Sequence, residues 1–183
     1  MASAVQWDDS TGEPYLDVPG HPGVRLTPYR DTRAEEDALI EISNRPDVGR
    51  WSYGRRYPLR AEPGTAVPTA PFSVVRGPDG AYLGEVYVWA DAERPGVLEM
   101  SYSLLPDARG RGLGAASVRA VVGWAGRGMG AHTVEAMVET ENAASSGLMA
   151  KLGFVRAEVR GVRWPKDKGG GVRECAFWRL DLA

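Results

Sequence analysis

The sequence contains a single cysteine, Cys175, which excludes an intramolecular disulfide. It has two histidines, and its histidine, cysteine and carboxylate residues do not cluster with the spacing of a metal site. No apolar stretch approaches the roughly 20 residues that a membrane-spanning helix needs. The N-terminus lacks the basic start and apolar run of a secretory signal. We therefore expect a cytoplasmic protein without a metal ion.

The charge balance is equally unremarkable, with a formal net charge of −2. This total gives no reason to expect nucleic acid or a membrane surface as a partner. Charged and turn-forming residues dominate residues 1–22, which predicts an N-terminal arm that is irregular or forms a short hairpin. Residues 23–183 are predicted to be one domain, because a chain of 183 residues can bury a core without disulfides or metals.

Hydrophobic periodicity and turn residues predict the order of elements within that domain. Strands are expected at 24–28, 72–76, 81–89, 97–105, 132–138, 155–164 and 172–182. Helices are expected from Asp31 or Thr32 to about residue 43, at 113–125, and from Asn142 to residue 153. This order predicts an α+β fold: a mixed, mostly antiparallel sheet flanked by helices, with one parallel crossover through the helix at 113–125.

A glycine-rich run at residues 109–114 (RGRGLG) lies between an expected strand and an expected helix. Such a turn leaves backbone N–H groups bare at the positive end of the helix, which favours an anion, most often a phosphate. The run also fits a dinucleotide-binding fingerprint, Gly110-x-Gly112-x-x-Ala115, although three antiparallel strands before it are wrong for that fold. A tight turn without a ligand is the remaining interpretation, but two arginines beside three alternating glycines are more than a turn requires.

A third way to parse the run, Arg109-x-x-Gly112-x-Gly114, resembles the acyl-CoA pyrophosphate loop of the GCN5-related N-acetyltransferases (GNAT). Two later motifs resemble the same family at the usual separation: Asn142-x-x-Ser145 and the run at 151–154 (KLGF). Two further segments are similar to the RimJ/RimL-like branch of the family, at 99–102 (EMSY) and 44–48 (NRPDV). The resemblance covers residues 24–182 and implies a GNAT-like fold with a splayed central strand pair.

The resemblance implies acetyl-CoA as acyl donor, and the residue spacing already gives no reason to expect a metal. The pyrophosphate would lie on the loop, and the pantetheine arm would pair with the edge of the strand that ends at Leu104 and Leu105. Arg109 and Arg111 would add charge, although the first arginine usually serves the loop itself in this family. The residues expected to bind the donor are Leu104, Leu105, Arg109, Gly110, Arg111, Gly112, Leu113, Gly114, Ala115, Asn142 and Ser145.

The activity that this resemblance implies is N-acetylation of a primary amine by direct transfer in a ternary complex. The amine must lose a proton, and Glu99 is our candidate base, acting directly or through water. A backbone N–H near Leu104 would stabilise the developing oxyanion. Many family members protonate the departing thiolate with a tyrosine that is Met149 in this chain. Because methionine cannot donate a proton, Ser145 becomes the candidate donor.

Two other functions stay open at this point: a non-catalytic acyl-CoA-binding module or sensor on the same fold, and a small dinucleotide-binding protein. The acceptor would be a protein or peptide N-terminus or a small molecule, and the sequence does not choose between them. Trp51, Tyr53, Tyr57 and the loop at 165–171 are expected to border its pocket. Many relatives are dimers, so a homodimer is compatible with the resemblance.

Overall fold

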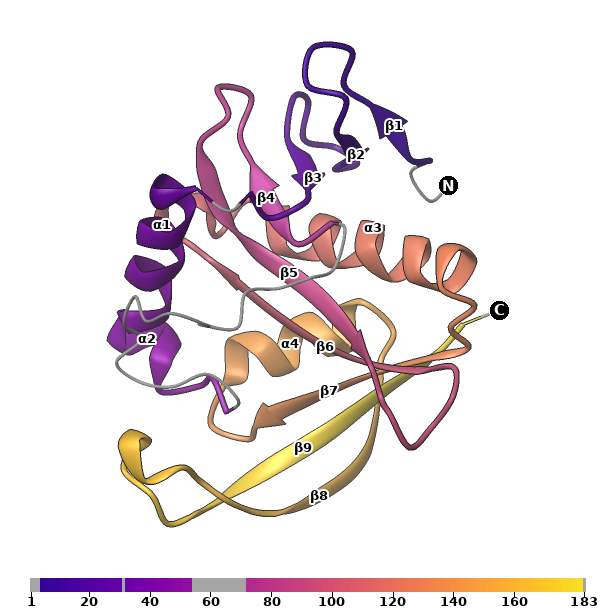
Figure 1. The fold of residues 1–183 in the computed structure, drawn as a ribbon. Helices are drawn as coiled ribbons and strands as arrows, with labels where there is room; N and C mark the ends of the chain where they lie inside the picture. Colours follow the sequence, from indigo (N-terminus) through magenta and orange to yellow (C-terminus); the bar gives the residue numbers. More distant parts are fainter. Residues whose placement is uncertain (1–3, 31, 54–71, 183) are drawn as a thin grey trace.

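The computed structural model of the chain describes residues 4–30, 32–53 and 72–182. Within that part, nine strands form a sheet in the order β1-β2-β3-β4-β5-β6-β7-β9-β8 (Figure 1). The strands are β1 (Gln6–Trp7), β2 (Pro14–Asp17), β3 (Arg25–Thr27), β4 (Val74–Arg76), β5 (Tyr82–Ala90), β6 (Val97–Leu104), β7 (Thr133–Glu139), β8 (Val155–Arg163) and β9 (Val172–Asp181). The helices are α1 (Arg33–Asn44), α2 (Pro46–Gly49), α3 (Leu113–Gly128) and α4 (Ala143–Lys151), with short 3₁₀ helices η1 (Pro106–Ala108) and η2 (Lys166–Lys168).

The predicted fold class is confirmed: the sheet is mixed, β6 and β7 form a parallel pair, and the other described pairs are antiparallel. The crossover from β6 to β7 runs through α3, as predicted. The N-terminal arm forms a short hairpin, β1–β2, whose second strand pairs with β3. Leu16 of that strand is fully buried in the core, so the arm packs on the sheet, and the boundary at residue 22 stays a prediction.

The two faces of the sheet carry different helices (Figure 1). The main core cluster joins α3 and α4 to one face, through side chains such as Val118, Met149 and Met100. On the other face, α1 packs against β5. Its buried residues recur at helical spacing: Glu35, Leu39, Ile42 and Ser43.

The parallel pair of β6 and β7 is short. The pairing joins Val97–Glu99 to Thr133–Glu135, although β6 continues to Leu104 and β7 to Glu139. Beyond Glu99, β6 stays paired with β5 as far as Leu104, and β7 stays paired with β9. The two strands therefore diverge, and we call the diverging stretches, residues 100–104 and 136–139, the splay. It is the splayed central pair that the family resemblance implies.

A buried ion pair fastens α1 to the sheet. The Glu35 carboxylate contacts the Arg76 guanidinium of β4, and the two side chains are 7% and 8% exposed. Arg76 also donates from Nε to Thr27 Oγ1 at 2.7 Å, and Glu35 accepts from the backbone N–H of Arg30 at 2.7 Å. Thr32 caps the helix, as predicted, by accepting from the Glu35 N–H, whereas Asp31 lies outside the described residues.

We expect Glu35→Ala to lower the free energy of unfolding by about 3–5 kcal/mol, because it leaves the Arg76 charge buried without its partner. Urea unfolding followed by circular dichroism measures this change. Asp37→Ala is the matched control on the same helix, since it removes an exposed pair with Arg33 and should cost less than about 1 kcal/mol. Equal losses in the two variants would contradict the assignment.

Candidate active site

The glycine run forms a tight connection from η1 into α3. Gly110 and Gly112 have φ angles of +77° and +81°, a backbone region that strongly favours glycine. A Cβ at either position would meet no atom within 4 Å, so the space above the loop is open. Gly112 is the N-cap of α3 and offers no side-chain cap. Within the described residues, the N–H groups of 113–115 therefore point out of the helix start without an intrahelical acceptor.

Both loop arginines are bound by the protein itself. Arg109 donates from Nε to the carbonyl of Leu104 at 2.7 Å, and its Nη1 lies 2.5 Å from Asp47 Oδ2 in α2. This hydrogen bond from Arg109 lowers the pKa of Asp47. The Arg111 guanidinium donates to the carbonyl of Asp107. Both arginines therefore brace the loop, and their role in binding the donor stays a prediction.

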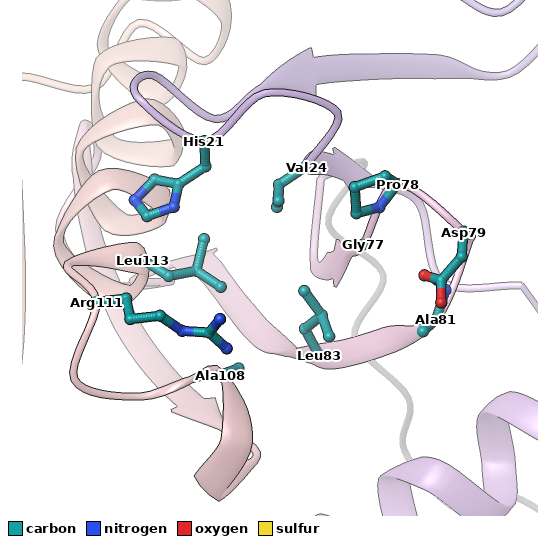
Figure 2. A pocket seen from close by; sticks show the side chains of 10 residues that line it. All are labelled: His21, Val24, Gly77, Pro78, Asp79, Ala81, Leu83, Ala108, Arg111 and Leu113. Carbon is teal, nitrogen blue, oxygen red and sulfur yellow. The ribbon is translucent and has the colours of Figure 1, made fainter.

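A cavity of about 300 Å³ lies on one side of this loop (Figure 2). Its lining comes from the loop and helix start, the β2–β3 connection and the β4–β5 hairpin, with His21 and Arg111 at one end and Asp79 at the other. The lining residues do not include β7 or α4, which form the far side of the splay. The cavity is therefore separate from the path between β6 and β7.

Glu99, the predicted base, occupies the last paired position before the splay, opposite Glu135 of β7. It is partly buried, and among the described residues it makes no hydrogen bond or ion pair. Glu135 is bound differently, since Arg94 donates to both of its oxygens at 3.0 and 2.8 Å. Of this neighbouring pair, Glu135 is therefore held by an arginine, and Glu99 has no such partner among the described residues.

The predicted donor, Ser145, lies in the first turn of α4. Asn142 caps that helix, as predicted, because its Oδ1 accepts from the Ser145 N–H at 3.1 Å. The Ser145 hydroxyl oxygen lies 2.6 Å from the hydroxyl oxygen of Tyr102 in β6. Met149, which has no proton to donate, is fully buried in the core.

Tyr102 is a candidate that the sequence interpretation missed. Its place in the 99–102 motif was visible, but strand position alone does not reveal a contact with a helix about 40 residues later. Burial raises the pKa of the Tyr102 hydroxyl, and the hydrogen bond with Ser145 acts in the opposite direction. The phenol is therefore protonated at neutral pH.

Glu99 and Tyr102 lie on opposite faces of the sheet. Side chains alternate along a strand, so residues 98, 100, 102 and 104 share the face that packs on α3 and α4. Glu99 shares the other face with its β5 neighbour Trp89. A group held in the splay would have a carboxylate on one side and a pair of hydroxyls on the other.

Two of the segments expected to border the acceptor pocket do meet. The Lys168 ammonium in η2 donates to the backbone carbonyls of Ser52 and Tyr53. The Tyr53 ring packs edge-on against Trp164, with 5.3 Å between ring centroids. The loop at 165–171 and residues 52–53 therefore form one surface, whereas Tyr57 lies outside the described residues.

Within the described chain, no group of three or more histidine, cysteine or carboxylate side chains could hold a metal ion. No described helix is both long enough and apolar enough to cross a membrane.

Comparisons with known proteins agree with the fold. The family model of the acetyltransferase (GNAT) domain matches residues 24–155. No curated protein matches the chain. A solved structure of a proposed acetyltransferase from Acinetobacter baylyi ADP1 is 22% identical, with a TM-score of 0.70, over 87% of this chain and 93% of that chain.

Two further solved structures contain ligands. A spermidine N-acetyltransferase from Vibrio cholerae, in complex with CoA and spermine, is 13% identical, with a TM-score of 0.71, over 88% of this chain and 96% of that chain. A proposed acetyltransferase from Salmonella typhimurium, with its cofactor acetyl-CoA, is 26% identical, with a TM-score of 0.53, over 60% of this chain and 63% of that chain. The Acinetobacter and Vibrio structures are both less than 25% identical to this chain, so their similarity shows only a shared fold.

We expect Gly112→Ala to weaken acetyl-CoA binding about tenfold. Alanine is strained at the positive φ of this position, and a backbone shift that relieves the strain would move the N–H groups of the loop. Isothermal titration calorimetry measures the affinity. Gly130→Ala, at the other end of α3, is the matched control, since Gly130 has a φ of +64° and open space around its Cβ position. Both variants should lose about 1–2 kcal/mol of stability. Equal binding losses in both would show that the loop is not the contact.

Proposed function

The chain belongs to the GNAT family of acetyltransferases, and from that premise we propose that it transfers the acetyl group of acetyl-CoA to a primary amine. The transfer would be direct, in a ternary complex of enzyme, donor and acceptor. The observation that carries the proposal is the splay, which opens beside a helix start with bare N–H groups.

The donor side follows from backbone groups. A pyrophosphate needs several hydrogen-bond donors in a small volume, and the start of α3 offers the N–H groups of 113–115. The pantetheine arm is peptide-like, and residues 100–104 of β6 have no partner in β7. An arm lying along this edge would carry its thioester between β6 and α4.

On the acceptor side, Glu99 would remove the proton from the attacking ammonium, directly or through a water molecule. Its position at the mouth of the splay and its lack of a partner among the described residues support this role. A backbone N–H near Leu104 would stabilise the developing oxyanion, and Ser145 would donate to the departing sulfur.

We also propose membership of the RimJ/RimL-like branch, on the motifs at 44–48 and 99–102. The acceptor classes that this leaves are the amino terminus of a protein or peptide and a small amine. The surface formed by residues 52–53, Trp164 and the loop at 165–171 would contact it.

Two measurements test the proposed function. Calorimetric titration with acetyl-CoA should show binding, and release of the free thiol should follow when an amine is added. The amine panel would contain a peptide with an N-terminal alanine, spermine and free amino acids. Binding without thiol release for every amine would instead support a non-catalytic acyl-CoA sensor, and an absence of binding would refute both.

We expect Glu99→Gln to lower kcat by about 10²–10⁴-fold, because the amide cannot accept the amine proton. Acetyl-CoA affinity should stay within about twofold of the wild type, since no donor contact is removed. Steady-state thiol release and calorimetry measure the two quantities.

Glu135→Gln is the matched control, because it makes the same change one strand away on a carboxylate held by Arg94. It should keep near wild-type kcat. Equal losses of kcat in the two variants would point to a structural effect and would count against Glu99 as the base.

A further inference from the structure

We propose that Tyr102 positions the Ser145 hydroxyl against the sulfur of the acyl donor and replaces the proton that Ser145 gives up. This role rests on the proposed acetyl transfer. It supplies a source of protons for the departing sulfur, which the methionine at position 149 cannot provide.

The contact between the two hydroxyls joins β6 to α4 on one face of the splay. Tyr102 belongs to residues 100–104 of β6, which have no partner in β7, and Ser145 belongs to α4, which follows β7. Their oxygen atoms are 2.6 Å apart, a short hydrogen bond between hydroxyl groups. A thioester that lies along the free edge of β6 would therefore pass beside this pair.

Ser145 is held at two points. Its backbone N–H donates to the Asn142 cap, which fixes the start of α4. A serine hydroxyl otherwise rotates freely, and the contact with Tyr102 removes that freedom. The phenol is the stronger acid of the pair, so the Tyr102 O–H donates to Ser145 Oγ. The serine O–H is then left to donate to a further acceptor, which in this place is the sulfur.

The position of Met149 supports this arrangement. Ser145 and Met149 are one turn apart and share a face of α4. Met149 is fully buried in the core that also contacts the Tyr102 ring. Tyr102 thus brings a phenol to this face of α4 from the neighbouring strand. Burial keeps that phenol protonated before the reaction, because it raises the pKa of Tyr102.

The proposed step balances as follows. The amine nitrogen bonds to the thioester carbon, the carbon–sulfur bond breaks, and its electron pair stays on the sulfur. Ser145 gives its proton to the sulfur, which yields the CoA thiol, and Tyr102 gives its proton to Ser145 Oγ. The ammonium gives one proton to Glu99 before the attack and a second as the amide forms, and both pass on to solvent. The Tyr102 phenolate takes a proton from solvent as the products leave.

Tyr102→Phe tests the role, because it removes the hydroxyl and keeps the ring in the core. With acetyl-CoA and the amine that gives the fastest thiol release in the panel above, kcat should fall about 100-fold. KM for acetyl-CoA should change less than about threefold. Tyr15→Phe is the matched control: it removes the hydrogen bond from a tyrosine hydroxyl to Gln6 in the β1–β2 hairpin and should keep wild-type kcat.

A double-mutant cycle shows whether the two hydroxyls act as a unit. Ser145→Ala should lose about as much kcat as Tyr102→Phe, and adding Tyr102→Phe to it should change kcat less than about twofold. Losses that multiply would mean that the residues act independently and would overturn the proposal.

An acetyl-CoA analogue with selenium in place of the thioester sulfur separates proton donation from packing. A selenolate is a weaker base than a thiolate and needs the proton less, so the loss in Tyr102→Phe should shrink at least about tenfold. The same loss with both donors would indicate a structural role and contradict the proposal. Ser145→Ala leaves the Tyr102 ring in place and gives the same comparison if Tyr102→Phe does not fold.

Different experimental results would refute this proposal and the proposed function. A wild-type protein that neither binds acetyl-CoA nor releases thiol refutes the function itself. A wild-type enzyme that transfers acetyl, together with a folded Tyr102→Phe variant of unchanged kcat, overturns only the role of Tyr102.

Discussion

The divergence of β6 and β7 is the constraint on which the rest of the site depends. Each strand keeps its outer partner, β5 or β9, and the two share a short parallel ladder that ends at Glu99 and Glu135. Backbone groups past that point need another partner, which an extended, peptide-like arm can supply. Because the strands are parallel, α3 and α4 both begin at the open end of the splay. One feature of pairing therefore places a free strand edge and two helix starts together.

Charge is distributed around the splay in a way that follows from this geometry. The arginines of the loop are held by Leu104, Asp47 and Asp107, and the N–H groups of 113–115 have no acceptor within the helix. Glu99 lies on the face of the sheet away from α3 and α4, and the hydroxyls of Tyr102 and Ser145 lie on the other. We infer that the amine approaches from the carboxylate side and that the sulfur departs toward the hydroxyls.

Local patterns in the sequence predicted much of this arrangement. Turn residues and periodicity gave the element order, and the Asn142 cap and the glycine turn depend on neighbours in the chain, so both were recognisable. The pairing of Arg109 with Asp47 and of Tyr102 with Ser145 could not be read, because each joins residues 43 to 62 positions apart. The same is true of the arm, where burial of Leu16 depends on its pairing with Leu26. The roles of the individual site residues stay predictions.

Amide hydrogen exchange with and without CoA tests the central claim most directly, because it reports on the backbone groups that the account assigns to the ligand. The account predicts that CoA slows exchange at residues 110–115 and along 100–104, with little change at residues 21–24 and 77–81, which line the far side of the cavity. Protection confined to residues 21–24 and 77–81, or no protection at the loop and the free edge of β6 while CoA is bound, would contradict it.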